Sequence, residues 1–408
     1  MSFRRCCVGA GIYGPQIIPQ GHSLVPLLGN SQQSGVTELF STLWLYCPDK
    51  SIHLYPYSFY HKLQEQMDTI SHIALGWTVG WLIGGRKLGK KAYLRGMALG
   101  NLPDLDVFVW PLLYSDALQA SAFHRWPTHS ILFALVAAPL CAYIINKIHK
   151  GDKASWWTWT LVAFFAIITH SLLDVLTNYG TELFWPFTST AYSLNSIFIV
   201  DPLYTIPLLL CVLAALIIKD HIRAWKVSTW GLGISTAYLI FGLVLKFAVI
   251  NPVMNQALAQ QDLPIVQSFT TPEALQKALR RQVAVTEDDF IQWWYSIFDS
   301  HRDIQYISIP RMTELLDPYR DDESVQRLLE RAQWYYLVRP RDDGGVLLVD
   351  VRFGWLNGWQ EQEENFVFGY NIYEEDGQIV VGGRNRWDEG RSLPDDVLRI
   401  WWERVRWI

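Results

Sequence analysis

The chain has 408 residues, of which 50% are hydrophobic and 18% are charged, and its formal net charge is −5. These averages combine three chemically different pieces. Residues 1–66 carry a net charge of +1, residues 67–250 carry +4, and residues 251–408 carry −10, from 17 Lys/Arg and 27 Asp/Glu. The apolar runs of the middle piece are long enough to span a membrane and exclude a soluble single-core enzyme. Because the only strongly charged piece is acidic, nucleic-acid binding through a basic surface is disfavoured.

The first piece, residues 1–66, shows no sustained helical or strand periodicity and no apolar core of a secretion signal. Helical patterning begins at Met67. We therefore expect residues 1–66 to be a non-native or disordered N-terminal extension of a protein whose translation starts at Met67. Intact-mass measurement of the product of the native gene tests this expectation.

The middle piece, residues 67–250, contains six apolar runs, the second of which is broken around Pro103. They cover residues 70–84, 92–114, 130–147, 156–179, 199–218 and 230–250. A helix needs about 20 residues to cross a bilayer core of ~30 Å, and the last four runs meet this length clearly. We predict a polytopic α-helical membrane bundle with about six membrane segments.

Basic residues are concentrated in alternate connections between these runs. Lys and Arg cluster at 86–95, 147–153 and 219–226, whereas 115–129 and 180–198 carry few charges. Since cytoplasmic connections are enriched in Lys and Arg, the clusters are expected to face the cytoplasm. The pattern predicts a multi-pass protein of the bacterial inner membrane whose residues 251–408 are periplasmic.

The acidic piece, residues 251–408, is predicted to be a soluble α+β domain. We expect helices at 273–282, 287–298 and 323–336, and strands at 334–339, 346–353, 364–373 and 378–383. With a single lysine, Lys277, and a single histidine, His301, the domain cannot easily assemble its own zinc site. We expect it to be a noncatalytic cover or substrate-selecting module, with residues 270–272 and 295–299 near the membrane surface.

Ionisable residues inside membrane segments are costly, and here they fall in one layer, the outer half of the predicted bundle. The layer contains His72, Asp104, Asp106, His124, His129, His170, Asp174 and Asp201. His170 and Asp174 are one helical turn apart, a spacing that can supply two metal ligands or a buried hydrogen bond between helices. Asp104 and Asp106 follow a proline break and could bridge two cations, whereas a helix cap would explain only one of them. The cysteines form no metal-binding spacing, so a metal would use histidines and carboxylates.

In order and spacing these motifs resemble the YdjM-type family of bacterial inner-membrane, metal-dependent hydrolases. The motifs are His72, Gly100–Asp106, His124–Arg125, Thr128–Ser130, His170–Asp174, Thr177 and Gly180. That family in turn resembles, more distantly, the helical zinc-dependent phospholipase C and nuclease superfamily, which implies phosphoester hydrolysis. The chain lacks that superfamily's second H-x-x-x-E motif, so the resemblance implies one or two zinc ions rather than three.

We therefore expect a membrane-bound metal-dependent hydrolase that acts on a membrane lipid or lipid-linked phosphoester at the outer half of the bilayer. The candidate ligands of a divalent metal, for which Zn²⁺ is the best fit, are His72, Asp104, Asp106, His124, His129, His170 and Asp174. Asp104 or Asp106 could be the general base, and Arg125 could hold a phosphate or, alternatively, snorkel to the interface. The other functions that the sequence allows are an ion- or proton-coupled transporter and a membrane anchor for a periplasmic interaction domain.

Overall fold

The computed structural model describes most of the chain from Ser58 onward, all within one compact unit, Pro56–Ile408. The described residues are 58–113, 125–148, 155–199, 201–273, 277–299, 306–342, 344–354, 366, 368–385, 402–403 and 405–406, without the side chains of 58–68, 110–113 and 383–385. His124 and most of the predicted extension 1–66 lie outside the described residues. Helix α1 (Ser58–Leu88) begins before Met67, and the predicted start of translation stays a prediction.

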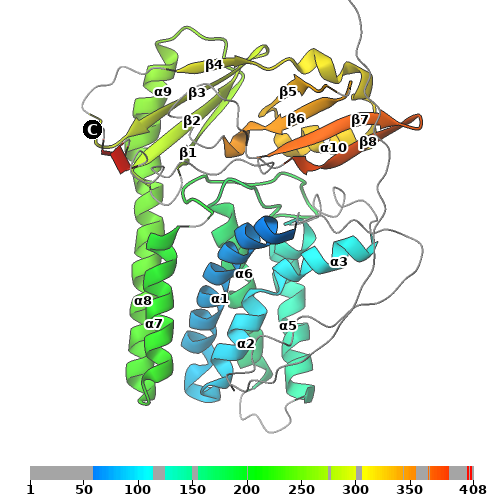
Figure 1. Cartoon of the computed structure of the whole chain (residues 1–408). Coiled ribbons are helices and arrows are strands. Elements are labelled where there is room, and N and C mark those ends of the chain that lie inside the picture. Colours follow the sequence, from blue (N-terminus) through cyan, green and yellow to red (C-terminus); the bar gives the residue numbers. More distant parts are fainter. Residues whose placement is uncertain are drawn as a thin grey trace, which may run out of the picture. The chain divides into compact units, whose positions relative to one another are not determined.

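The part of the chain with apolar runs is helical (Figure 1). After α1 come α2 (Lys91–Gly100), the 3-10 turn η1 (Pro103–Leu105), α3 (Asp106–Leu113), the 3-10 turn η2 (Pro127–His129), α5 (Ile131–Ile148), α6 (Trp156–Val175), α7 (Pro202–Ile217), α8 (His221–Val244), the π-helical η3 (Leu245–Ile250) and α9 (Asn251–Ala259). Among the described residues, three helical stretches are long and apolar enough to cross a membrane: 131–148, 156–175 and 221–259. The prediction that this part of the chain contains membrane-spanning helices is therefore confirmed, whereas the number of six spans stays a prediction.

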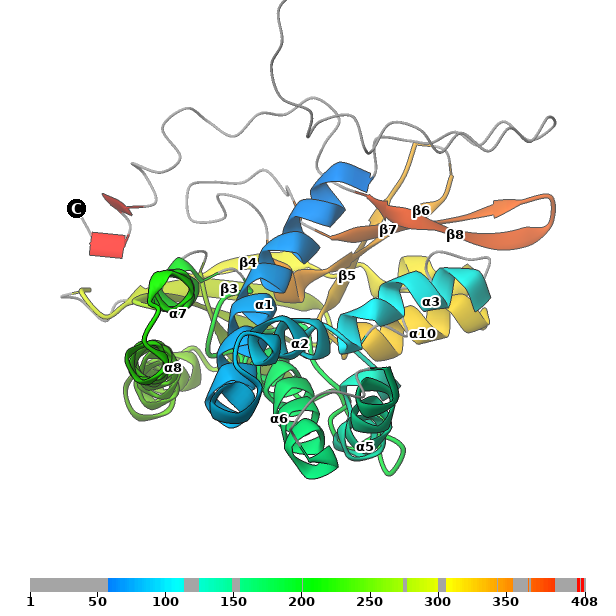
Figure 2. The ribbon, with the colours of Figure 1, turned by 90° about the horizontal axis from the view of Figure 1, so that it is seen from below.

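Helix α6 lies between the α1–α2 hairpin and α5, and the α7–α8 pair lies against α1 (Figure 2). The backbones of α1 and α2 approach closely because glycines line their contact. A Cβ atom on Gly80 would lie 2.5 Å from the Ala92 carbonyl oxygen, and one on Gly96 would lie 2.4 Å from the Gly76 carbonyl oxygen. Small residues at such contacts let membrane helices pack at short range. The hairpin fixes α1 relative to the turn that follows α2.

The predicted break in the second apolar run is confirmed. Helix α2 ends at Gly100, and Pro103 opens η1, where a missing N–H group costs nothing. Helix α3 then starts in a new direction at Asp106 (Figure 1). The break lets the backbone turn between α2 and α3. Asp104 therefore lies on the short 3-10 turn η1 and not on a long membrane helix.

The C-terminal domain contains two four-stranded antiparallel sheets. The first has the order β1–β2–β3–β4 and the second the order β5–β6–β7–β8. The strands are β1 (Gln267–Pro272), β2 (Leu279–Val285), β3 (Asp289–Ser296), β4 (Ile307–Pro310), β5 (Tyr336–Pro340), β6 (Val346–Asp350), β7 (Gly369–Glu375) and β8 (Gln378–Asn385), with η4 (Thr313–Tyr319), α10 (Glu323–Ala332) and η5 (Val351–Phe353) between them. Val283 and Phe290 of the first sheet share a core with Leu337 and Val349 of the second. The predicted strands of the second half correspond to β5–β8, and the predicted helix at 323–336 is α10, which ends at Ala332.

Two of the predicted helices are wrong. Residues 279–282 belong to β2 and residues 289–296 form β3, whose aromatic and β-branched residues favour strands. Residues 274–276 of the first predicted helix lie outside the described residues. Glu287 does not start a helix: it lies in the tight turn between the strands, which the Thr286 N–H closes on the Asp289 carbonyl oxygen at 2.9 Å. Every residue of β2 is buried, so the solvated face expected of a surface helix does not exist there.

The last membrane helix continues through η3 and, beyond the expected boundary at residue 250, as α9. Met254 of α9 is fully buried and packs with Trp293 of β3. The two segments expected near the membrane surface both contact this region: Thr270 accepts a hydrogen bond from Lys246, and Tyr295 belongs to the same apolar cluster as Met254. The division into domains at residue 250 stays a prediction.

Candidate metal centre

Five of the predicted ligands converge from four elements of the helical part. They are His72 of α1, Asp104 of η1, His129 of η2, and His170 and Asp174 of α6. Each is at most 1% exposed except Asp104, whose side chain is 24% exposed. They form two three-residue groups able to hold a metal ion, His72–His170–Asp174 and Asp104–His129–His170, with His170 in both.

The two histidine nitrogens in the middle of the cluster are in close contact. The Nε2 atoms of His129 and His170 are 3.1 Å apart. Asp104 Oδ1 lies 3.4 and 3.2 Å from them, and Asp174 Oδ2 lies 3.3 and 3.5 Å from them. Neighbouring ligand atoms in a tetrahedral shell with 2.0–2.1 Å bonds are about 3.3 Å apart. These five distances therefore match the spacing that a small divalent cation requires.

Hydrogen bonds between these side chains account poorly for the same geometry. An imidazole Nε2 carries at most one hydrogen, yet each of these nitrogens has three polar neighbours within 3.5 Å. Asp174 is fully buried, and its Oδ1 atom has the Arg125 guanidinium and the His72 ring as described neighbours, each at 3.3 Å. Its Oδ2 atom faces the Nε2 atoms of His129 and His170 at 3.3 and 3.5 Å. A buried carboxylate is costly unless cations surround it. The donor set therefore fits a metal ion better than a hydrogen-bonded structural core.

The second oxygen of Asp174 faces two further groups. His72 Nε2 and Arg125 Nη2 each lie 3.3 Å from Asp174 Oδ1. Arg125 is 7% exposed, donates through Nη1 to Thr177 Oγ1 at 3.2 Å and lies over the Tyr179 ring. The side chain is therefore buried beside the cluster and is not in a snorkelling position, and its role with a phosphate stays a prediction.

His129 is held from its opposite ring nitrogen. Thr128 Oγ1 lies 3.0 Å from His129 Nδ1 and donates to Asp106 Oδ2 at 2.7 Å. Asp106 Oδ2 is itself 3.8 Å from His129 Nδ1. A contact of this kind fixes the ring orientation and the tautomer of a metal-binding histidine. Asp106 thus lies on the supporting side of His129, away from the Nε2 atom that faces the cluster.

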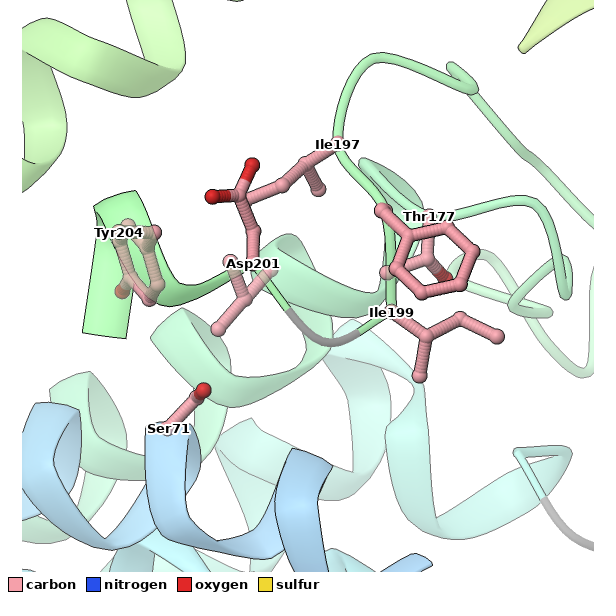
Figure 3. Close-up of a pocket in the computed structure, with 8 residues that line it drawn as sticks. Ser71, Thr177, Ile197, Ile199, Asp201 and Tyr204 are labelled. Atoms are coloured by element: carbon pink, nitrogen blue, oxygen red, sulfur yellow. The ribbon is translucent and has the colours of Figure 1, made fainter. Parts of the chain in front are cut away.

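A small cavity, lined mostly by apolar residues, lies between α1, the end of α6 and the start of α7 (Figure 3). Its volume is about 10 Å³, and Ser71, Thr177 and Asp201 contribute its polar lining. Such a volume holds about one water molecule. Asp201 also begins α7 by accepting from the Leu203 N–H group, and it accepts from the Tyr238 hydroxyl. These contacts give Asp201 a structural role, as the cap of α7 and as a partner of Tyr238.

Glu182 is a carboxylate beside the centre that the predicted ligand set does not include. The Glu182 N–H group donates to the Arg125 carbonyl oxygen at 3.2 Å. Burial raises the pKa of the Glu182 carboxyl to about 7, and a hydrogen bond from Trp126 opposes that rise. Glu182 is the one charged residue of the 180–198 connection, and this is the sequence signal that distinguishes it.

The comparisons with known proteins cover the same part of the chain. Residues 67–249 match the family model described as "YdjM inner membrane protein". Residues 67–249 form a YdjM-family domain. The resemblance of the motifs to the YdjM inner-membrane family is therefore confirmed for residues 67–249, whereas a hydrolase activity stays a prediction. The match contains every residue of the candidate metal centre. No solved structure matches the chain.

Two curated proteins are similar to this YdjM-family domain. Inner membrane protein YbcI of Escherichia coli (strain K12) is 30% identical over 118 residues, which is 28% of this chain and 64% of that protein. The uncharacterized protein YfhP of Bacillus subtilis (strain 168) is 29% identical over 146 residues, 33% of this chain and 42% of that protein. The chain thus spans less than two thirds of either relative. Together with the three apolar helices, the family and YbcI support a location in the bacterial inner membrane.

Proposed function

We propose that the YdjM-family domain is a metal-dependent hydrolase whose centre lies in the outer half of the membrane bundle. The observation that supports it most is the pair of His129 and His170 nitrogens, 3.1 Å apart and each within 3.5 Å of both Asp104 and Asp174. Asp104 is the one partly exposed member of this buried set. A structural metal site is normally closed, whereas a catalytic site needs an open side for substrate.

Zinc fits this donor set best. Neutral imidazoles and carboxylates are ligands that Zn²⁺ shares with Mn²⁺ and Fe²⁺, but the separations of 3.1–3.5 Å are those of a small tetrahedral shell. His170 belongs to both three-residue groups, and His72 lies beside Asp174. One ion between His129 and His170, with room for a second next to His72, agrees with this geometry.

The residues around the centre have two roles in the proposed reaction, proton transfer and positioning of the ligands. A bound divalent metal would lower the pKa of water to about 7 and polarise the scissile group. Asp104, on the open side, accepts the proton of the attacking water as general base. Arg125 holds Asp174 in place, and Asp106 holds His129 through Thr128. Arg125 also supplies positive charge close to where a phosphoryl group would be bound.

The surroundings of Asp104 favour a lipid or lipid-linked phosphoester as substrate. Leu105, next to Asp104, is 48% exposed, and Phe108, on the first turn of α3, is 70% exposed. Apolar side chains exposed on a membrane protein face acyl chains at low cost. On the side where Asp104 is partly exposed, the outer surface is apolar, at Leu105 and Phe108, and the Asp104 carboxylate lies further in. This arrangement suits an amphiphile whose head group reaches Asp104.

Replacing Asp104 by asparagine tests the catalytic part of this proposal. In detergent with excess metal, the variant should lose about 10²–10⁴-fold in kcat, the usual contribution of a general base. Because Asp104 is also a candidate ligand, the metal content of the same samples is measured, and kcat is compared at equal metal content. The substrates are p-nitrophenyl phosphate, bis(p-nitrophenyl) phosphate and short-chain glycerophospholipids, assayed with Zn²⁺, Mn²⁺ or EDTA. Asp220→Asn is the matched control, since Asp220 caps α8 at the basic end of the bundle and asparagine also caps helices well. Ion flux without turnover by the wild-type protein would instead favour a transporter.

The C-terminal domain is proposed to be periplasmic. The basic residues of the α1–α2 and α7–α8 connections lie at the end of the helices opposite to the sheets (Figure 1), and such residues mark the cytoplasmic side. A tag fused after Ile408 should be cleaved by protease added to intact spheroplasts. A tag at the same position that is cleaved only after lysis would place the domain, and the open side of the centre, in the cytoplasm.

A further inference from the structure

Two buried cations meet one short stretch of backbone in the 176–199 connection. Lys246 Nζ donates to the Leu194 carbonyl at 2.7 Å and to the Asn195 carbonyl at 3.3 Å. Arg280 donates to the Asn195 carbonyl at 3.1 Å and to the Ser196 carbonyl at 3.2 Å. Three consecutive carbonyl groups, 194–196, are therefore bound by side chains from two distant parts of the sequence.

These cations also connect the membrane helices to the first sheet. Lys246 lies on η3 and donates to the Thr270 carbonyl of β1 at 2.9 Å. Arg280 lies on β2 and donates to the Gly242 carbonyl of α8 at 3.4 Å. Lys246 is 5% exposed and Arg280 is fully buried, and within the described part of the chain no salt bridge joins either to a carboxylate. Burying two cations on carbonyl dipoles alone is expensive, which indicates a specific role.

The amide side of the same stretch caps the helix that carries two ligands of the centre. The Leu194 N–H group donates to the Val175 carbonyl at 2.7 Å, and the Ser196 N–H group donates to the Leu176 carbonyl at 2.8 Å. These are carbonyls that the end of α6 would otherwise leave without partners. Asp174 immediately precedes Val175. The Asn195 carbonyl and the Ser196 N–H group belong to one peptide group, so the two side chains bound to that carbonyl act on the Leu176 carbonyl through it. Hydrogen bonds in such a chain polarise and strengthen one another.

A second contact joins the C-terminal domain to the same connection. Asn178 Nδ2 donates to the Arg352 carbonyl at 3.4 Å, and Arg281, the neighbour of Arg280, donates to that carbonyl at 3.1 Å. The Arg352 side chain is fixed by three hydrogen bonds to the Asp350 carboxylate. Asn178 directly follows Thr177, which accepts from Arg125. Both contacts lead to the segment that begins where α6 ends.

We propose that the C-terminal domain is a structural part of the metal centre, in which Arg280 is a positioning residue that fixes the last turn of α6 and hence Asp174. This inference rests on the proposed function only in naming the centre a metal site. This role differs from that of a cover or a substrate-selecting module. Disturbing a cover leaves the affinity for metal unchanged, whereas replacing a positioning residue lowers that affinity.

The test compares two fully buried arginines of the same domain in the full-length protein in detergent. Arg280→Met removes the contacts to residues 195 and 196. Arg311→Met is the matched control, because Arg311 also donates only to carbonyl groups, but all of them belong to the C-terminal domain, at Thr286, Glu287, Trp334 and Tyr336. The readouts are Co²⁺ affinity, the visible absorption of bound Co²⁺, and hydrogen exchange of residues 170–177 in the metal-free protein.

Arg280→Met should weaken Co²⁺ binding about 10- to 100-fold, the usual effect of losing a supporting contact of a ligand, shift the absorption bands and speed exchange of residues 170–177. Arg280→Lys should recover part of the affinity, and Arg311→Met should leave all three readouts at wild-type values. Equal readouts for Arg280→Met and wild type, or equal losses in both methionine variants, would overturn the inference. If Arg280→Met does not fold, Lys246→Gln tests the same link from η3 with the same outcomes. A wild-type protein that binds no Co²⁺ would overturn the proposed function, while hydrogen exchange would still decide whether Arg280 holds the end of α6.

Discussion

Replacing His170 by alanine is expected to abolish the metal content of the purified protein. His170 is the one residue shared by both candidate groups, and its Nε2 atom lies within 3.5 Å of three other donor atoms. Loss of a ligand exceeds the 10- to 100-fold effect typical of a lost supporting contact, so the affinity should fall by more than about 100-fold. Metal analysis of the purified protein and calorimetric titration with Zn²⁺ measure the effect.

The control for this variant is His221→Ala, because His221 is also a histidine of a membrane helix but lies at the first position of α8, away from the centre. Added Zn²⁺ should raise the melting temperature of the wild type and of His221→Ala, since a ligand that binds only the folded state stabilises it, and should leave that of His170→Ala unchanged. Wild-type metal content in His170→Ala would show that the cluster is a hydrogen-bonded core.

Replacing Gly80 by alanine should cost stability and metal affinity together. The added Cβ atom would lie 2.5 Å from the Ala92 carbonyl oxygen and 2.7 Å from the Gly96 Cα atom, both of them backbone atoms that cannot move aside alone. The α1–α2 hairpin must therefore open, and overpacking of this kind costs about 1–3 kcal/mol. Because α1 carries His72 and α2 leads to Asp104, the shift should also separate these two ligands.

Unfolding of the detergent-solubilised variant and titration with Zn²⁺ measure the two effects of Gly80→Ala. Gly233→Ala is the matched control, since Gly233 is an exposed glycine of α8 and a methyl group added there would have no atom within 4 Å. It should keep wild-type affinity and be at least as stable as the wild type, because alanine favours a helix more than glycine does. A Gly80→Ala protein as stable as Gly233→Ala would show that the α1–α2 contact is looser than described.

Most of the candidate ligands could be predicted from the sequence, because the signals that mark them lie within short stretches of the chain. Charged residues stand out in apolar runs, the spacing of His170 and Asp174 places them on one helix face, and Pro103 marks the break before Asp104. The glycines of the α1–α2 contact also leave a signal in the sequence, the four-residue spacing from Gly76 to Gly80, which is typical of closely packed membrane helices. The support of His129 by Thr128 and Asp106 depends on side-chain directions at η2 that no spacing reveals.

The C-terminal domain was predicted less well, for a physical reason. Its second sheet has clear hairpin turns, such as the one between β7 and β8, and its strands agree with the prediction. Strands β2 and β3 are covered on both faces, and each contains a fully buried polar residue, Gln282 or Gln292. These residues interrupt the apolar pattern by which a buried strand is predicted. The contacts of Arg280 and Lys246 could not be predicted at all, because their acceptors are backbone carbonyls, which every sequence contains.

The residues that hold the end of α6 are synthesised after the metal ligands themselves. The ribosome makes all five converging ligands early, on α1, η1, η2 and α6, whereas Arg280 and Arg352 emerge only after every membrane helix has been made. If Arg280 positions Asp174 as inferred, the ligands of a nascent chain have their native spacing only once the C-terminal domain has folded. Maturation with metal would then be the last stage of biogenesis and would take place on the side of the membrane where the C-terminal domain folds.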